Sequence, residues 1–325
     1  MRVHVLDDWF DTLRGLPSFA RLDGHEVTVW TDHEPDPAKL AARMRDAEAL
    51  ALFRERTVVD AALIEGLPNL KLVSLRGQYP HVDLEALARR GITLCSDMHR
   101  DAPSTPAAEL TFALILSALR DLPAQIDSAR AGRWQAGVGR NARGKRLGLL
   151  GYGGIARKVA GYARAFGMDV VWWASDDGRA RAAADGETVA ESRRAFFAES
   201  DVVSLHQRLT PATRSGVTAD DLSAMRSDAI LVNTARAGLI ESGALLAALD
   251  AGRPGRAAID VFDAEPVTDP ADPLVSHARV IPTPHIGFVT EDELDLQFDA
   301  IFGQIADFAA GRPRNVISPA PPRGG

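Results

Sequence analysis

Residues 147–173 read LGLLGYGGIARKVAGYARAFGMDVVWW, and the rest of the chain is organised around them. The stretch is typical of a short apolar strand, a glycine turn, a helix with one apolar face and a second strand. In the turn Gly151-x-Gly153-x-x-Ala156, the first glycine makes a tight turn, the second lets a pyrophosphate approach the backbone, and the small third residue lets helix and strand pack closely. The helix N-terminus would add N–H groups and a partial positive charge for the phosphates. The sequence therefore predicts a βαβ unit that binds a dinucleotide; the alternative is a bare tight turn in an α/β core.

Composition restricts the class of protein. The chain has 325 residues, of which 46% are hydrophobic, and this length suggests about two domains. Its 37 Lys and Arg against 44 Asp and Glu give a net charge of −7 without a basic block, which argues against nucleic acid or an anionic membrane as partner. Cys95 is the only cysteine, so we expect no intrachain disulfide and a reducing compartment. The start MRVHVLDDWF has two acids where a signal peptide is apolar, and the longest apolar run, 110–119, is too short for a bilayer. We expect a soluble cytoplasmic protein.

Strand and helix patterns alternate along the chain. In the first hundred residues strands are expected at 3–6, 27–30, 49–53, 70–75 and 92–95, and helices at 37–45, 59–64 and 84–89. From residue 147 onward strands are expected at 147–150, 170–173, 202–206, 230–233, 258–262 and 280–281, and helices after the glycine turn and at 219–225 and 243–249. Repeated βα units predict two parallel, doubly wound sheets.

Three further segments frame these sheets. Residues 107–119 form a strongly apolar helix with a polar continuation to Gly132, and burial on most sides would suit the seam between two domains. A last long helix is expected at 291–310, after the second sheet is complete. The proline-rich tail from Pro313 onward is expected to be frayed.

Polar residues concentrate at strand ends in the second half of the chain, where open α/β sheets hold their ligands. The segments concerned are His206, Asn233-Thr-Ala-Arg-Ala-Gly238, Ala258-Ile-Asp-Val-Phe-Asp-Ala-Glu-Pro266 and Thr283-Pro-His-Ile-Gly287. The order GxGxxA, N-T-x-R-x-G, D-V-F-x-x-E-P and T-P-H-I-G resembles the D-isomer-specific 2-hydroxyacid dehydrogenase family. The match runs from about Glu109 to Gly287, and Gly77 followed by Val82-Asp83-Leu84 echoes the family in the first domain.

The resemblance implies a fold and an activity. The fold is two doubly wound parallel-sheet domains: a Rossmann cofactor domain, 99–288, inserted into a flavodoxin-like substrate domain, 1–98 and 289–325, with the active site in the cleft. The activity is hydride transfer between a nicotinamide cofactor and a small anionic 2-hydroxy or 2-oxo acid, of glyoxylate, hydroxypyruvate or phosphoglycerate type. The family usually forms homodimers through the cofactor domain, and the helix at 110–119 is a candidate for part of that surface.

The resemblance also implies catalytic roles for three residues. His285 would exchange the hydroxyl proton, because an imidazole titrates near neutrality. Glu265 would pair with His285, fix its tautomer and keep it protonated for reduction. Arg236 would hold the substrate carboxylate through a two-pronged contact and polarise the reacting carbonyl. Each residue alone also fits a structural or solvated role, but the three together at family spacing favour the catalytic interpretation.

The cofactor residues implied by the resemblance lie at the same strand ends. Asp260 would lie near the nicotinamide, beside the backbone of Thr234, Ala235 and Gly287. The full set is Gly151, Gly153, Gly154, Ile155, Ser175, Asp176, His206, Thr213, Thr234, Ala235, Asp260 and Gly287, and no metal is expected. The related formate dehydrogenases have glutamine where this chain has Glu265, which argues against formate as substrate.

The first domain would bind the substrate carboxylate through the Arg76-Gly77-Gln78 turn. Arg76 departs from the small residue usual in the family, and Arg54, in FRERT, resembles the family's V-R-S-x-T loop. One hypothesis is that Arg54, supported by Arg76 or Arg100, selects a substrate with extra negative charge; the alternative is that these arginines are solvated. The loop also departs from the family at Tyr79, Pro80 and His81.

The choice between NAD and NADP depends on the end of the strand at 170–173. The acidic residue that normally binds the adenosine ribose there is replaced by Ala174. Ser175 with Arg179 or Arg181 would favour NADP, whereas Asp176-Asp177 would bind the ribose and repel a phosphate. The balance favours NAD, with use of NADP as well.

A different class of protein fits the same fold. The carboxy-terminal binding protein corepressors share it and act mainly as nucleotide-sensing interaction proteins with little turnover. No extension or peptide-binding signal in this sequence supports that role. Phosphite oxidation on the same scaffold is a minor alternative.

Overall fold

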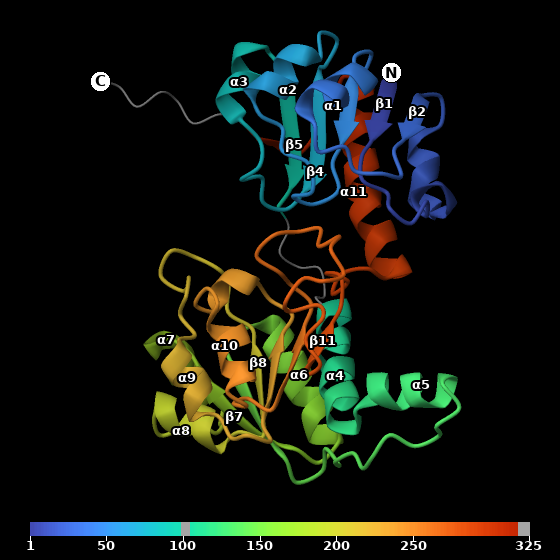
Figure 1. Ribbon diagram of the computed structural model, residues 1–325. Helices are drawn as coiled ribbons and strands as arrows, with labels where there is room; N and C mark the ends of the chain where they lie inside the picture. Colours follow the sequence, from blue (N-terminus) through green and yellow to red (C-terminus); the bar gives the residue numbers. More distant parts are fainter. Residues whose placement is uncertain (99–104, 318–325) are drawn as a thin grey trace. The chain divides into compact units, whose positions relative to one another are not determined.

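The computed structural model describes residues 1–98 and 105–317. The chain divides into two compact units: unit 1, Met1–Ala102 with Val289–Gly325, and unit 2, Pro103–Phe288 (Figure 1). The sequence-based divisions are 98/99 and 288/289. No helix among the described residues is long and apolar enough to cross a membrane.

Unit 1 is built on a six-stranded sheet in the order β12-β5-β4-β3-β1-β2. Its strands are β1 (Arg2–Val5), β2 (Glu26–Val29), β3 (Ala49–Ala51), β4 (Leu72–Arg76), β5 (Thr93–Asp97) and β12 (Val316–Ile317). All pairs are parallel except β12 with β5. The parallel part has the 2-1-3-4-5 order of flavodoxin-like sheets, which confirms the predicted fold of this unit.

Helices cover both faces of this sheet. They are α1 (Pro37–Arg43), α2 (Ala61–Gly66), α3 (Leu84–Arg89) and α11 (Glu291–Ala309), with 3₁₀ turns η1 (Leu13–Gly15) and η2 (Pro17–Leu22). Successive residues of β4 face opposite sides, as strand geometry requires. Val73 belongs to the core shared with α1–α3, whereas Ser74 donates from Oγ to the Ile301 carbonyl of α11 at 2.8 Å.

The expected fraying of the tail from Pro313 is wrong for the residues up to 317. Val316–Ile317 pairs with β5, and the Ser96 amide donates to the Asn315 carbonyl at 2.9 Å. Asn315 also donates from Nδ2 to Oε1 of Gln304, which is fully buried on α11. The proline-rich composition of this segment gave no indication of the short antiparallel strand β12. The rest of the tail lies outside the described residues.

Unit 2 contains an all-parallel sheet in the order β11-β10-β9-β8-β6-β7. Its strands are β6 (Arg146–Leu150), β7 (Asp169–Trp173), β8 (Val202–Leu205), β9 (Ile230–Asn233), β10 (Arg256–Ile259) and β11 (Val280–Pro282). A single bridge from Trp172 to Val189 continues the sheet beyond β7. Counting that bridge, the strand order is the 3-2-1-4-5-6 arrangement of dinucleotide-binding sheets with one further strand, so the predicted Rossmann unit is confirmed.

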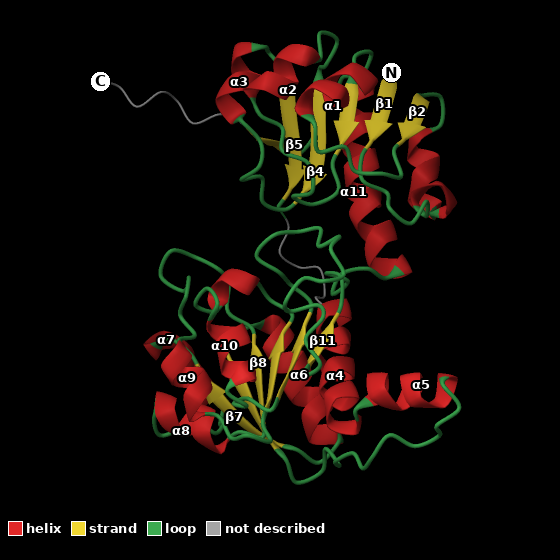
Figure 2. Ribbon diagram, viewed as in Figure 1, coloured by secondary structure: helices red, strands yellow, loops and turns green. Residues whose placement is uncertain are grey.

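Helices cover both faces of this second sheet (Figure 2). They are α4 (Thr105–Arg120), α5 (Leu122–Arg130), α6 (Gly154–Ala165), α7 (Asp176–Ala184), α8 (Arg193–Glu199), α9 (Ala219–Ala224) and α10 (Ala244–Asp250), with the 3₁₀ turn η3 (Ala237–Leu239). One core joins α4 and α6 to the sheet, and a second joins α8, α9 and α10 to the opposite face. The sequence analysis did not predict α7 and α8.

The apolar helix lies in unit 2. Phe112, Ile115 and Leu119 of α4 are buried in the core of this unit with Val159 of α6, and this core accounts for their apolar character. The polar continuation is a separate helix, because Asp121 takes the left-handed conformation, φ +52°, between α4 and α5. Asp121 forms an ion pair with Arg256 of β10.

Candidate active site

The glycine turn lies after β6, where the strand order of the sheet reverses. Gly151 has φ +109°, and a Cβ there would lie 3.0 Å from the His206 carbonyl, so only glycine fits. A Cβ at Gly153 or Gly154 would meet no atom of the described residues within 4 Å. This open space lies at the N-terminus of α6, which has twelve residues. The turn therefore leaves room for a pyrophosphate against free helix N–H groups, as the dinucleotide prediction requires.

Two predicted cofactor residues, His206 and Thr213, lie in the segment that follows β8, and His206 borders the glycine turn. The His206 amide donates to the Leu150 carbonyl at 2.8 Å, and its imidazole Nε2 lies 2.9 Å from the Ser204 hydroxyl. Burial lowers the pKa of His206 to about 4, so the ring is neutral. Thr213 donates from Oγ1 to the Arg208 carbonyl at 2.6 Å and accepts from the Thr210 amide at 2.8 Å. The Thr213 hydroxyl therefore stabilises the loop that follows His206.

Arg236, Glu265 and His285 follow three adjacent strands, β9, β10 and β11. His285 Nδ1 lies 2.5 Å from Glu265 Oε2, and the other carboxylate oxygen accepts from the Phe262 amide at 2.8 Å. Burial would raise the pKa of Glu265, but the bonds from His285 and Phe262 and the charge of Arg236 bring it below its usual range. The carboxylate is therefore ionised and aligned on the imidazole.

Arg236 is placed by its own loop. Asn233, at the end of β9, accepts from the Ala235 amide at 3.0 Å and donates to the Arg236 carbonyl at 3.0 Å. The Arg236 side chain donates from Nη1 to the Ala235 carbonyl at 2.7 Å. Thr234 shares a 2.6 Å hydroxyl contact with Thr111 of α4. Asn233 lies in the motif that contains Arg236 and was given no role from the sequence; its side chain closes the Arg236 turn.

Asp260 holds the loop that carries His285. Its buried carboxylate accepts from the Thr283 hydroxyl at 2.6 Å and from the Ile286 and Gly287 amides at 2.8 Å each. Burial raises the pKa of Asp260 and outweighs these three bonds, which lower it. A Cβ at Gly287 would lie 3.1 Å from the Asp260 carboxylate, so glycine permits this close approach.

The far end of the cofactor site lies after β7. Ala174 is buried there, and Ser175 caps α7 by accepting from the Gly178 amide at 3.2 Å. The Asp176 side chain is 97% exposed and accepts from Arg179 at 2.6 Å. Arg179 also donates to the Ala174 carbonyl at 2.8 Å and covers the Trp173 ring, with 4.2 Å between guanidinium carbon and ring centre. A cation and an exposed carboxylate therefore flank the position expected for the ribose.

Unit 1 places its predicted substrate residues at the carboxyl ends of β3 and β4. Arg54 and Arg76 approach the same oxygen, Oε1 of Glu293 on α11, at 4.0 and 3.9 Å. Arg76 also lies 3.7 Å from Asp97, at the end of β5. The sequence analysis missed Glu293, because only the fold brings α11 beside β4. Arg100 lies outside the described residues.

The turn after β4 has the backbone required by its glycine. Gly77 has φ +99°, its amide donates to the Asp97 carbonyl at 3.0 Å, and its carbonyl accepts from the Ser96 hydroxyl at 2.7 Å. The Gln78 amide has no partner in the described part of the chain. Both ring nitrogens of His81, further along this loop, are buried and likewise lack a partner among the described residues.

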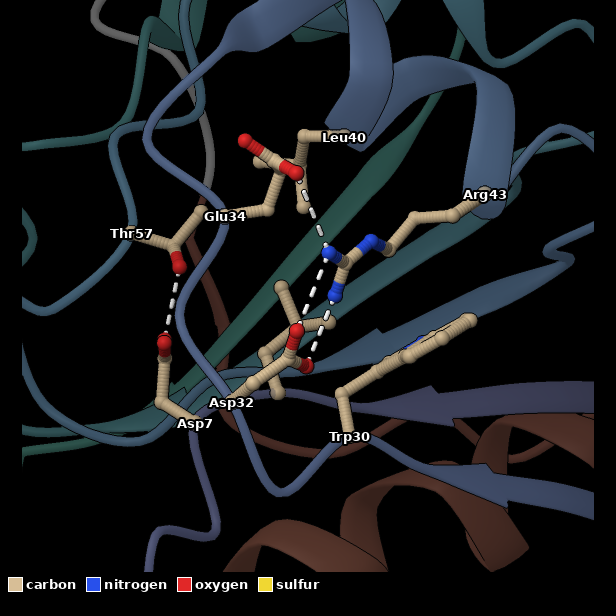
Figure 3. A pocket seen from close by; sticks show the side chains of 8 residues that line it. Asp7, Trp30, Asp32, Glu34, Leu40, Arg43 and Thr57 are labelled. Carbon is tan, nitrogen blue, oxygen red and sulfur yellow. Dashed lines mark hydrogen bonds and ion pairs between the residues drawn. The ribbon is translucent and has the colours of Figure 1, made fainter.

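A small cavity in unit 1 is distinct from these residues (Figure 3). It measures about 10 Å³, roughly the room of one water molecule. Its walls carry an Asp7–Thr57 hydrogen bond of 2.6 Å and the pair Arg43–Asp32 at 2.8 Å. The cavity is too small for a nucleotide or an organic acid. Within the described residues, no three His, Cys, Asp or Glu side chains are placed to hold a metal.

A dinucleotide turn, together with an arginine, a glutamate and a histidine at neighbouring strand ends, defines a nicotinamide-dependent oxidoreductase. Residues 112–287 match the family model described as D-isomer specific 2-hydroxyacid dehydrogenase, NAD binding domain. The chain therefore belongs to the D-isomer-specific 2-hydroxyacid dehydrogenase family, as its motifs predicted.

Individual relatives agree with this membership. Glyoxylate reductase of Aeropyrum pernix is 34% identical over 310 residues, 90% of each chain. D-3-phosphoglycerate dehydrogenase of Methanocaldococcus jannaschii is 35% identical over 284 residues, 86% of this chain but 53% of that protein, so this chain spans about half its length. The crystal structure of phosphoglycerate oxidoreductase from Vibrio cholerae has a TM-score of 0.90 at 40% identity, covering 96% of this chain and 99% of that one. None of these three is a corepressor.

Proposed function

We propose that this chain interconverts a small 2-oxo acid and the D-2-hydroxy acid, with Arg236, Glu265 and His285 as its catalytic residues. The observation that carries the proposal is the 2.5 Å contact between His285 Nδ1 and an ionised Glu265. This contact places a proton on Nδ1 and leaves Nε2 to exchange a proton with the substrate oxygen.

A bound reduced nicotinamide would supply the hydride. His285 donates its Nε2 proton to the carbonyl oxygen during reduction, and Glu265 stabilises the imidazole while it is protonated. Arg236 holds the substrate carboxylate with its planar guanidinium, which fixes the carbonyl relative to His285. In the reverse direction His285 takes the hydroxyl proton instead.

The substrate proposed is a 2-oxo acid with an uncharged side chain, such as glyoxylate or hydroxypyruvate. Among the described residues, Arg54 and Arg76 face the carboxylates of Glu293 and Asp97, so the charges of these four side chains balance. A second anionic group on the substrate would therefore gain little net attraction there. The turn at Gly77–Gln78 still offers an N–H donor for the single carboxylate.

A spectrophotometric panel tests this assignment. Glyoxylate, hydroxypyruvate, pyruvate, phenylpyruvate, oxaloacetate and phosphohydroxypyruvate are each offered with NADH and with NADPH. We expect hydroxypyruvate to give a higher kcat/KM than phosphohydroxypyruvate, which differs from it by the phosphate. A strong preference for the phosphorylated acid, lost in Arg54→Ala, would restore the hypothesis of a second anion site. No turnover of any acid by a chain that binds cofactor would favour the sensor alternative.

For the cofactor we propose NAD, with NADP accepted less well. Asp176 and Asp177 precede Arg179 in α7, and the exposed Asp176 carboxylate holds the Arg179 guanidinium. A 2′-phosphate at this end would meet two carboxylates and an arginine that is already paired. Asp176→Ala should therefore raise kcat/KM with NADPH relative to NADH, with Asp220→Ala, in the first turn of α9, as control. Equal ratios in both variants would contradict the assignment.

We further propose a homodimer formed through unit 2. The described residues expose Leu122 and Ile126 on α5, and Trp134 and Val138 in the following loop; Trp134 is 76% exposed. Figure 1 shows α5 projecting from the rest of its unit. Apolar side chains on such an arm are typical of a subunit interface. Sedimentation should give a dimer that Trp134→Asp dissociates; a monomeric wild type would refute it.

The compartment proposed is the cytoplasm. Cys95, the only cysteine of the chain, is a buried thiol within β5, and burial raises its pKa to about 11. An unpaired thiol fits a reducing environment.

A further inference from the structure

The residue between the first two glycines of the turn makes an unusual contact. Tyr152 lies between Gly151 and Gly153, and its hydroxyl donates to Asp185 Oδ2 at 2.5 Å. Asp185 is the C-cap of α7, at the opposite end of this helix from Ser175. One hydrogen bond therefore connects the pyrophosphate turn to the helix that begins at the ribose end of the site.

The Tyr152 ring is fixed independently of its hydroxyl. It is buried and meets Trp172 of β7 edge to face, with 4.7 Å between ring centres. The guanidinium groups of Arg157 and Arg181 lie over it at 5.5 and 5.7 Å. The hydroxyl bond to Asp185 raises the pKa of Tyr152, with burial as the second cause. A phenylalanine would keep the packing and lose only the bond.

The helix that this bond reaches is the one that carries the groups at the ribose end. Asp176 and Arg179 both belong to α7, and Ser175 caps it. The helix also packs closely against the strand end, since a Cβ on Gly178 would lie 2.7 Å from the Ala174 Cβ. A shift of α7 would therefore move the Asp176–Arg179 pair relative to the glycine turn.

We propose that the Tyr152–Asp185 bond is a tether that sets the distance between the pyrophosphate turn and the ribose end, and thereby the discrimination between NAD and NADP. Tyr152 and Asp185 are positioning residues, since they act on the cofactor through the turn and α7. The inference rests on the dinucleotide-binding part of the proposed function and needs no particular substrate.

The test is equilibrium binding of NADH and NADPH to the full chain, followed by fluorescence without substrate. Tyr152→Phe should weaken NADH binding about two- to tenfold, the worth of one hydrogen bond, and bring the ratio of the two dissociation constants closer to one. Asp185→Ala removes the same bond, together with a 4.0 Å ion pair to Arg157, from a side chain that is 51% exposed, so it keeps the core intact. The double variant should bind NADH no more weakly than Asp185→Ala, as expected for two ends of one contact.

Tyr162→Phe is the matched control, because its ring packs against Phe112 and its hydroxyl has no partner in the described part of the chain. The tether is refuted if Tyr152→Phe binds both dinucleotides as tightly as Tyr162→Phe does. A lower unfolding temperature of Tyr152→Phe without a change in binding would show that the bond has a structural role alone. Additive effects in the double variant would refute the tether as well. A lack of 2-oxo acid turnover would contradict the proposed function but would not affect the outcome of this binding test.

Discussion

His285 carries its imidazole on a backbone in the left-handed region, φ +54°, which few residues other than glycine adopt. The conformation persists because Asp260 accepts two amides from the next two residues and the hydroxyl of Thr283. The loop that carries His285 is therefore built around the buried Asp260 carboxylate. Asp260 directly follows β10, which fixes its position.

Asp260→Asn should lower kcat about 10- to 100-fold, because an amide cannot accept from all three donors and His285 would be displaced. The measurement is kcat and cofactor affinity at saturating substrate. Asp263→Asn, on the exposed loop that follows, is the matched control and should leave kcat unchanged. Unaltered kcat in Asp260→Asn would show that the three bonds do not position His285.

Glu265→Gln should lower kcat/KM for reduction at least about tenfold, because an amide replaces the carboxylate that holds His285 Nδ1 and the imidazole loses its alignment. The readout is kcat/KM for the best 2-oxo acid at one pH. A value equal to that of the wild type would contradict the pairing.

The lowered pKa of Glu265 makes the stability of the fold depend on pH. Its folded-state pKa lies below the ordinary value of 4.5, so the ionised carboxylate stabilises the fold above about pH 4.5. This contribution is lost as the pH falls through the lowered pKa. Glu265→Gln should remove that acid-side dependence, as seen by urea unfolding at pH 3 to 6.

At the scale of elements, β12 shows how a two-residue strand is secured. Asn315 donates to Gln304 at 3.1 Å, and Gln304 in turn donates to Ser74 Oγ at 2.8 Å and the Leu75 carbonyl at 3.0 Å. The tail is therefore tied to α11 and β4 through a buried amide.

Asn315→Gly should lower the free energy of unfolding by about 1–2 kcal/mol, because the Gln304 oxygen is left buried without its donor. Glycine is chosen since Asn315 has φ +54°. Asn141→Gly is the control for the added chain entropy, because Asn141 is exposed and its side chain has no partner among the described residues. Equal losses in the two variants would show that the Asn315 side chain contributes nothing.

Elements with strong apolar patterns could be predicted from the sequence, and those fixed by tertiary contacts could not. All eleven expected strands are present because each is a β-branched or apolar run between turn signals. In contrast, α7 has no large apolar residue, and the break between α4 and α5 comes at Asp121, which has a left-handed backbone and pairs with Arg256. Ser175 can be recognised as the N-cap of α7 only once the helix itself is known.

The residues of the candidate site also divide into those that local motifs predict and those that only tertiary contacts bring together. The placement of Arg236, Glu265 and His285 at neighbouring strand ends could be predicted, because their motifs are short and local. Glu293 could not, since α11 follows the second sheet in sequence yet packs on β4 of the first. Tyr152–Asp185 joins residues 33 positions apart and leaves no pattern in the sequence.

At the scale of the whole molecule, one chain builds two doubly wound sheets, each with its own core. Unit 1 is assembled from both ends of the chain, because α11 packs on the sheet formed by β1 to β5 and β12 adds its sixth strand. Unit 2 is continuous and carries the glycine turn and all three proposed catalytic residues. Substitutions within unit 2 can therefore test dinucleotide binding and proton transfer separately.

If His285 is the acid–base group of a 2-oxo acid reductase, the variant His285→Asn should lose reduction of the substrate and still bind the cofactor. Asparagine tolerates the left-handed backbone, so the loop should keep its shape. Single-turnover and steady-state reduction of the best 2-oxo acid should fall at least about a hundredfold, while NADH binds within about twofold of wild type. Turnover close to wild type in this variant, with cofactor bound, would contradict the account.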